Sequence, residues 1–296
     1  MKRICKRRIQ IDALTLCYQV ENPYYIEQLC NLSLGEYLDL DEFRLYRIDG
    51  RYFDNVYLIL TWDGERKVEW GTLKFNLASG NEKNNTHTNG MQKAWIYVAN
   101  PTLYSTEIFS LTYIEQRIGL AFHNVTSLDL ALDTPFNVSR LIKSFIRNKD
   151  ITTILNGKRV ANRKEDRPEI RYTTSGSLDN QCKYLSVVIK QRNAIWDKTK
   201  GITLQCYNKA AEISNVSGKE YIIEHYDNPK RLFRTEIHLN SEDIKNYVER
   251  RDIEYTPLFL FDEATLEKMF FYFIESVIRF QSDVSDVSWR HILGRS

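Results

Sequence analysis

Residues 128–133 read LDLALD, and the strict alternation of leucines with small or acidic residues decides the fold class. Successive side chains of a β-strand point to opposite faces of its sheet. The alternation therefore predicts a strand that buries three leucines on one face and projects Asp129, Ala131 and Asp133 from the other.

Similar strand patterns recur along the chain, separated by turn signals such as Asp49-Gly50 and Asp63-Gly64. We expect strands at 9–18, 42–48, 52–62, 68–77, 93–98, 127–134, 170–174, 183–190, 202–207 and 232–239. We expect helices at 23–30, 105–118, 138–147, 241–250 and 262–280. Short connections between successive strands imply antiparallel sheets with flanking helices, which is an α+β fold.

The order of strand, helix, several strands and helix occurs twice, which suggests pseudo-duplicated halves at about 9–118 and 127–240. We therefore expect one catalytic domain over 1–240, with a helical C-terminal region, 241–296, packed on it. The apolar residues of the helix at 262–280 extend beyond one stripe. This pattern favours burial on two sides of that helix over a surface for a partner.

The composition is that of a folded protein, because 43% of the 296 residues are hydrophobic and 27% are charged. No apolar stretch approaches the length of a membrane span, and the N-terminus lacks the apolar segment of a signal peptide. We expect a cytoplasmic protein with no membrane partner. The five cysteines are widely spaced and form no CxxC pair, which argues against a disulfide framework or a zinc site.

Positive charge is concentrated between residues 158 and 200, where eleven Lys or Arg stand against five acids. Such a segment could neutralise the phosphates of DNA, although a solvated loop with ordinary strand faces would carry similar charge. The candidate DNA-binding residues, with one arginine from a later strand, are Lys158, Arg159, Arg163, Lys164, Arg167, Arg171, Lys190, Arg192 and Arg234.

Residues 202–212 read ITLQCYNKAAE, so that a predicted strand ends with Tyr207 on its polar face. A packed ring with a wet hydroxyl is the ordinary role of such a tyrosine. A free tyrosine has a pKa of about 10 and needs a nearby base or cation to act as a nucleophile. Lys209, His238 or Glu212 could supply that help, and Tyr207, Lys209 and Glu212 are the candidate catalytic residues. Tyr172 and Tyr184 remain alternative nucleophiles.

Residues 233–239 alternate again, with Arg234, Glu236 and His238 on one face. Carboxylates with one imidazole suit Mg²⁺ or Mn²⁺. We therefore expect a divalent metal, which would stabilise the charge that develops on a reacting phosphate. The candidate ligands are Asp129, Asp133, Glu236 and His238. Solvent-facing positions on half-exposed strands are the alternative explanation for each of them.

The set formed by residues 11–16 (IDALTL), 128–133, 207–212 and 234–237 (RTEI) resembles the trans-acting replication initiation factors of rolling-circle plasmids. Conjugative-element relaxases and some phage replication proteins look similar. The resemblance implies that Tyr207 is the nicking nucleophile and that acidic residues on neighbouring strands hold the metal. It also implies origin DNA, single-stranded or as an extruded hairpin, a host helicase and a homodimer as partners. The five histidines form no His-x-His pair, so the metal site of the wider superfamily is missing.

The sequence thus predicts an enzyme, a rolling-circle replication initiator that nicks and rejoins DNA through a covalent 5′-phosphotyrosine link. Two alternatives stay open. A non-enzymatic DNA-binding protein would use the basic segment and its aromatic residues, and a metal-dependent phosphodiesterase would use water as its nucleophile.

Overall fold

The structure is a computed structural model, and it describes residues 8–63, 65–76, 87–88, 91–160, 169–175, 184–191, 201–283 and 285–294. The chain forms two compact units. Unit 1 contains the described parts of residues 1–10, 129–247 and 260–296, and unit 2 contains those of 11–128 and 248–259. The long strand β8 (Leu120–Thr134) runs through the boundary at residue 128.

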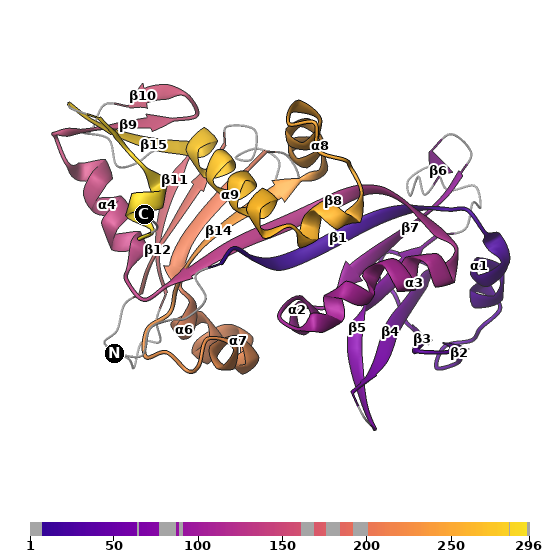
Figure 1. Ribbon diagram of the computed structural model, residues 1–296. Helices are drawn as coiled ribbons and strands as arrows, with labels where there is room; N and C mark the ends of the chain where they lie inside the picture. Colours follow the sequence, from indigo (N-terminus) through magenta and orange to yellow (C-terminus); the bar gives the residue numbers. More distant parts are fainter. Residues whose placement is uncertain are drawn as a thin grey trace. The chain divides into compact units, whose positions relative to one another are not determined.

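Unit 2 is an antiparallel sheet with helices packed on one face (Figure 1). The strand order is β8-β1-β7-β5-β4-β3-β2, with β6 beside β7. Its other strands are β1 (Gln10–Val20), β2 (Tyr37–Leu40), β3 (Phe43–Ile48), β4 (Asn55–Asp63), β5 (Arg66–Phe75), β6 (His87–Thr88) and β7 (Met91–Val98). Its helical elements are α1 (Pro23–Cys30), α2 (Asn100–Leu103), α3 (Leu111–Ile118) and the 3₁₀-helix η1 (Thr106–Ser110).

The end of α3 is fixed by Gly119, which has a left-handed φ of 79°. A side chain is rarely tolerated in this conformation, and a Cβ at Gly119 would lie 2.7 Å from the Cβ of Asn22. The carbonyl oxygen of Gly119 accepts hydrogen bonds from the backbone of Glu21 and Asn22. The glycine therefore both ends the helix and joins it to the segment that precedes α1.

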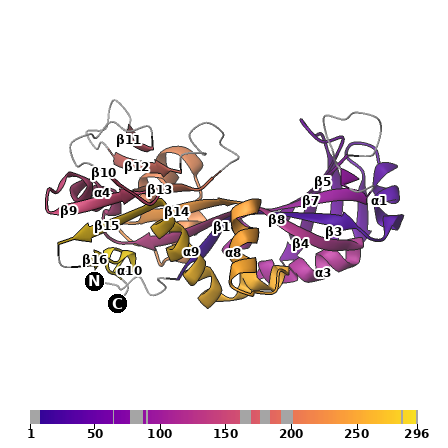
Figure 2. The ribbon, with the colours of Figure 1, turned by 90° about the horizontal axis from the view of Figure 1, so that it is seen from above.

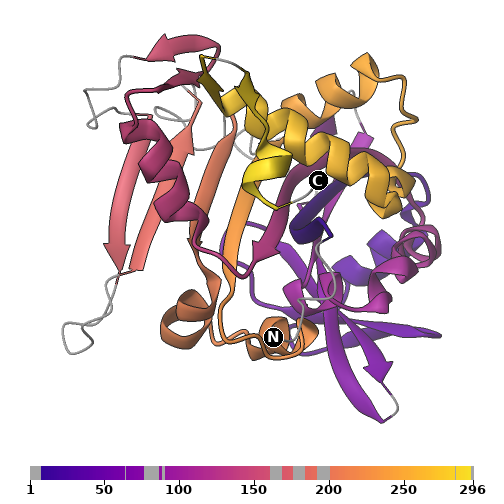
Figure 3. The ribbon, with the colours of Figure 1, turned by 60° about the vertical axis from the view of Figure 1, so that its left-hand side comes forward.

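Unit 1 is built on strands in the order β11-β12-β13-β14-β8. The new strands are β11 (Ile170–Ser175), β12 (Tyr184–Lys190), β13 (Thr203–Asn208) and β14 (Phe233–Asn240). Two helices, α4 (Val138–Arg147) and α9 (Glu263–Val277), lie on the same side of these strands (Figure 3). Contacts of both helices with β13 and β14 agree with this arrangement.

A small antiparallel sheet with the order β10-β9-β15-β16 completes unit 1 (Figure 2). Its strands are β9 (Ile151–Leu155), β10 (Lys158–Val160), β15 (Ile278–Ser282) and β16 (Asp286–Val287). The remaining α-helices and short helical turns in the described ranges are α6 (Lys209–Glu212), η2 (Ile213–Ser217), α7 (Glu220–His225), α8 (Ser241–Arg250), η3 (Pro257–Phe261) and α10 (Trp289–Ile292). In the part of the chain that the structure describes, no helix is long and apolar enough to cross a membrane.

The predicted α+β class with antiparallel sheets and flanking helices is confirmed. One predicted boundary is wrong, because the helix expected at 262–280 ends at Val277. Ile278 then pairs with Leu155 in the small sheet, so strand pairing stops the helix. The C-terminal region expected to be helical therefore also contains β15 and β16, and residues 260–296 belong to the same unit as 129–247.

Helix α9 is buried on more than one side, as its wide apolar surface predicts. Phe270 and Phe271 are 0% and 5% exposed. The guanidinium of Arg290, in α10, lies over the ring of Phe271 at 4.4 Å from its centroid. The apolar residues beyond the first stripe of α9 thus pack within unit 1.

Candidate active site

The polar face of three strands in unit 1 brings together the residues that the sequence singled out. Directly opposed residues on antiparallel strands share a face. The opposed pairs of β13 and β14 are Thr203 with His238, Gln205 with Glu236, and Tyr207 with Arg234. Two residues of β8, Asp129 and Asp133, reach this face through their contacts with His238 and Arg234. The predicted alternation of all three strands is therefore observed.

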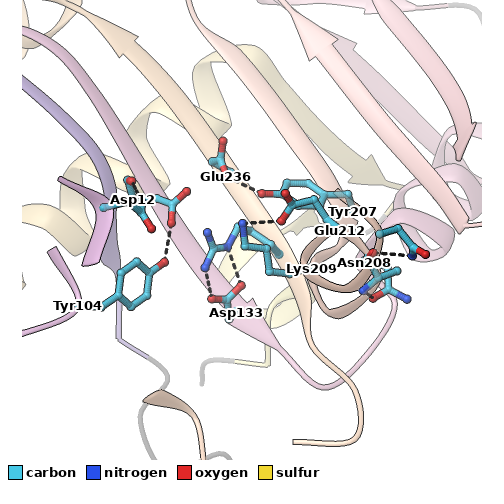
Figure 4. A network of polar contacts seen from close by, with 12 residues as sticks. Asp12, Tyr104, Asp133, Tyr207, Asn208, Lys209, Glu212 and Glu236 are labelled. Atoms are coloured by element: carbon cyan, nitrogen blue, oxygen red, sulfur yellow. Dashed lines mark hydrogen bonds and ion pairs between the residues drawn. The ribbon is translucent and has the colours of Figure 1, made fainter. Parts of the chain in front are cut away.

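Tyr207 lies at the end of β13 with its hydroxyl directed at a carboxylate (Figure 4). The Tyr207 hydroxyl donates a hydrogen bond of 2.8 Å to Oε2 of Glu236. Both residues are half-buried, so the pair is partly shielded from water but remains accessible. A carboxylate in this position can accept the phenolic proton. The sequence indicated Lys209, His238 or Glu212 as the residue that assists Tyr207. In the structure, the residue that accepts the hydrogen bond from the Tyr207 hydroxyl is Glu236.

Lys209 and Glu212 form a separate ion pair at the first turn after β13 (Figure 4). The short helix α6 is capped by Asn208, whose side chain accepts a hydrogen bond from the backbone of Ala211. The Lys209 Nζ is 2.8 Å from Oε2 of Glu212, and the lysine side chain is only 3% exposed. The same Nζ lies 5.7 Å from the ring centroid of Tyr207. Lys209 thus places a cation beside the tyrosine ring, with its charge balanced by Glu212.

Arg234 is buried, which corrects its assignment as a DNA-binding residue. Its guanidinium donates hydrogen bonds of 2.9 and 2.6 Å to the two oxygens of Asp133. Both side chains are 0% exposed. Burial raises the pKa of Tyr226, as do the negative charge of Asp133 and a hydrogen bond with it. The Asp133–Arg234 pair is therefore a buried ion pair on the polar face of these strands.

His238 is paired with the remaining acid of β8. Its Nδ1 lies 2.5 Å from Oδ1 of Asp129. The hydrogen bond with Asp129 raises the pKa of His238 and outweighs the opposing effect of burial. The negative charges of Asp129 and Glu236 also raise the pKa of His238. The imidazolium form is therefore more stable here than in an unperturbed histidine.

The four candidate metal ligands do not fit a divalent ion in this arrangement. Both oxygens of Asp133 are used by Arg234, and Asp129 and Glu236 contact His238 and Tyr207. A buried guanidinium also repels a cation at Asp133. Within the described ranges, no group of three or more His, Cys, Asp or Glu side chains could hold a metal ion.

Apart from Arg234, four of the predicted DNA-binding residues are described, and they lie on two surfaces of unit 1. Arg171 and Lys190 lie on the same face as Tyr207, because Arg171 is opposite Val188, Val188 opposite Gln205, and Lys190 opposite Thr203. Lys158 and Arg159 are exposed on the small sheet. Arg163, Lys164, Arg167 and Arg192 lie outside the described residues.

The structure separates Tyr172 from Tyr207. Tyr172 is opposite Val187, which is opposite the buried Cys206, so its side chain is on the apolar face of the sheet. The ring of Tyr172 lies 4.9 Å from Nζ of Lys143 on α4. Tyr184 begins β12, and its side chain lies outside the described part of the chain.

The sequence interpretation missed several residues. Tyr226 gave no local signal, because its contact with Asp133 joins distant segments. The cations Arg140, Lys143 and Arg147 line a surface hollow on α4, and their helical spacing was a usable signal. In unit 2, Asp12 accepts a hydrogen bond of 2.5 Å from the hydroxyl of Tyr104 (Figure 4).

Comparison of the chain with known protein-family models and with curated protein sequences finds no match.

Proposed function

We propose that this chain nicks and rejoins DNA, with Tyr207 as the nucleophile. The hydrogen bond of 2.8 Å from the Tyr207 hydroxyl to Glu236 carries the proposal. Tyrosine needs a proton acceptor to attack a phosphate, and a carboxylate at this distance can act as one. The positive charges of Arg171 and Lys190 on the same face support a phosphodiester substrate.

The proposed step balances without a further reactant. The phenolic oxygen of Tyr207 forms a bond to phosphorus, and the bond between phosphorus and the 3′ oxygen breaks. The phenolic proton passes to Glu236, the departing 3′ oxygen takes up one proton from solvent water, and Glu236 then releases its proton to solvent. The products are a 5′-phosphotyrosine link and a 3′ hydroxyl. Attack by that hydroxyl on the link reverses the step and rejoins the strand.

The proposed biological role is initiation of rolling-circle replication, as the resemblance of the four sequence segments implies. Origin DNA is then the substrate, and a host helicase and a second copy of the chain are proposed partners. The side chains that the structure describes form no ligand set for Mg²⁺ or Mn²⁺, so a metal requirement stays a prediction. No part of the proposed step depends on a metal.

The decisive experiment is detection of a covalent adduct. Overlapping single-stranded oligonucleotides covering the DNA around the gene would be incubated with the protein, in Mg²⁺, in Mn²⁺ and in EDTA. Denaturing gels should show a protein–DNA adduct and a shortened strand with a 3′ hydroxyl. The Tyr207→Phe variant should form neither, whereas Tyr172→Phe is the matched control and should form both.

The Glu236→Gln variant tests the proton acceptor. General-base catalysis typically contributes about 10²- to 10⁴-fold in rate. We expect adduct formation to slow by a factor in this range, with unchanged binding of the oligonucleotide. Strand cleavage that persists in Tyr207→Phe without an adduct would contradict the proposal and indicate a hydrolase. DNA binding with no cleavage in any metal would indicate a binding protein.

A further inference from the structure

One face of the sheet in unit 2 combines aromatic rings with cations. The opposite face of these strands is covered, since the Tyr57 hydroxyl donates a hydrogen bond of 2.7 Å to the Leu29 carbonyl of α1. Phe43 on that covered face also packs against Tyr113 of α3, with 6.2 Å between ring centroids. Among the described residues, helices α1 and α3 therefore pack on this face of the sheet.

The strand register defines the second face. Tyr46, two positions from Arg44 on β3, is opposite both Tyr37 and Leu58. Leu58 is opposite Thr72, and Thr72 is opposite Tyr97. This surface, called the aromatic face below, is made by Tyr37, Arg44, Trp62, Thr72, Lys74 and Tyr97.

Arg44 lies between two exposed rings of the aromatic face. Its guanidinium carbon is 3.8 Å from the ring centroid of Tyr37 and 5.6 Å from that of Trp62. Tyr37 is 49% exposed and Trp62 is 37% exposed. Large aromatic side chains that remain this exposed are available to stack with a planar ligand.

A second cation–ring pair lies on the same face. The Lys74 Nζ is 4.0 Å from the ring centroid of Tyr97. Neighbouring strands are about 4.8 Å apart, so β3 and β7 are separated by about 14 Å, which a few nucleotides can span. Aromatic rings and cations at this spacing can bind a nucleic-acid strand in which both the bases and the phosphates are accessible.

The charges of the face favour stacking over general phosphate attraction. Arg44 is paired with Asp39 through contacts of 2.5 and 3.0 Å. Lys67 and Glu69, both exposed, lie opposite Trp62 and Leu60. On this side of the described sheet, Arg44, Lys67, Lys74 and the buried Lys93 stand against Asp39 and Glu69, which is a small positive excess. A ligand that gains mainly from ring stacking must expose its base faces, as single strands do and duplexes do not.

We propose that the aromatic face of unit 2 binds single-stranded DNA by stacking bases on Tyr37, Trp62 and Tyr97. This proposal goes beyond the nicking reaction and does not require it. It assigns the surface to a nucleic-acid strand rather than to a protein partner, because cations alternate with the exposed rings.

The test measures binding of a fluorescent oligothymidylate of about 16 nucleotides, the upper site size of single-strand-binding folds, by anisotropy. Tyr37→Ala and Trp62→Ala should each weaken binding by about 10- to 100-fold, the loss expected for one stacked base. Tyr52→Ala is the matched control, since Tyr52 is 72% exposed with Arg51 at 5.3 Å from its ring centroid, outside the aromatic face. This control should bind like the unmodified protein.

Two further variants separate base stacking from contact with an apolar peptide. Trp62→Phe keeps a ring and should retain most of the affinity, whereas Trp62→Leu keeps apolar bulk and should lose it. Oligonucleotides carrying 5-iodouracil should photo-crosslink to peptides that contain Tyr37, Trp62 or Tyr97. Unchanged binding in Tyr37→Ala and Trp62→Ala, or full affinity in Trp62→Leu, would overturn the proposal.

The outcome is independent of the nicking chemistry. If Tyr37→Ala and Trp62→Ala weaken oligothymidylate binding but still form the covalent adduct at saturating substrate, the aromatic face and the nicking reaction are each supported independently. Normal adduct formation together with crosslinks only outside unit 2 would refute the aromatic face and leave the proposed function standing.

Discussion

The buried pair of Asp133 and Arg234 makes the sharpest stability prediction. Both side chains are 0% exposed, and the guanidinium and carboxylate share two hydrogen bonds of 2.9 and 2.6 Å. Replacing Asp133 by alanine removes the carboxylate that accepts both of these hydrogen bonds from the buried guanidinium. Breaking such a pair from one side typically costs about 3–5 kcal/mol. We expect a loss of this size in the free energy of unfolding for Asp133→Ala, and a comparable loss for Arg234→Met.

The double variant Asp133→Leu with Arg234→Met removes both charges and fills part of their volume. Replacing a buried ion pair by apolar residues is often nearly neutral, because the desolvation penalty of both ions is also removed. The double variant should therefore be more stable than either single variant. The coupling between the two positions then appears as a strong departure from additivity.

Urea unfolding followed by fluorescence and circular dichroism measures these free energies. Asp39→Ala is the matched control, because Asp39 also makes two hydrogen bonds to an arginine, Arg44, but at an exposed position. It should change stability much less, since exposed ion pairs contribute little. An Asp133→Ala variant as stable as Asp39→Ala, or losses that simply add in the double variant, would refute the reasoning.

Two further predictions concern a histidine and two glycines. The bond with Asp129 raises the pKa of His238, so the pair stabilises the fold fully below the unfolded pKa, about 6.5, and this contribution is lost as the pH rises through the folded pKa. Asp129→Asn should lower the pKa of His238 in an NMR titration and remove that part of the pH dependence, and an unchanged titration would contradict the assignment. Gly119→Ala should lower the thermal stability more than Gly157→Ala, because both have φ near 80° but only the first would place a Cβ within 3 Å of another residue. Backbone strain of about 1–3 kcal/mol is expected in both variants, and only Gly119→Ala adds a steric clash. Equal melting temperatures for the two variants would therefore argue against the clash.

Local sequence was sufficient to predict the strands β8, β13 and β14 and the face on which each of their side chains lies. The alternation in β8, β13 and β14 correctly indicated that Asp129, Glu236 and Tyr207 point away from the core. It also indicated the α+β class. Period-two alternation follows from the geometry of a single strand, so no knowledge of its neighbours is needed.

Local sequence failed where the outcome depended on competition between segments. The helix predicted through residue 280 ends at Val277 because Ile278 pairs with Leu155, which is more than a hundred residues away in the chain. The strands β9 and β10 were also missed. These two strands pair with each other across Asn156 and Gly157, and an Asn-Gly turn is a local hairpin signal that could have been used; only the pairing of β9 with β15 joins remote segments.

The sequence alone determined that a tyrosine, acids and a histidine would each lie on the polar face of its own strand, because side-chain direction is set residue by residue along each strand. Only the tertiary structure decided which of them touch. The alignment of the paired strands places Glu236 where it accepts a hydrogen bond from Tyr207. It also places Asp133 where it accepts one from Arg234, which is 101 residues away in the chain. That register also buried Arg234 and divided the expected metal ligands among other partners. Pairing of this kind follows from the alignment of distant strands and the packing around them, neither of which is contained in any one segment.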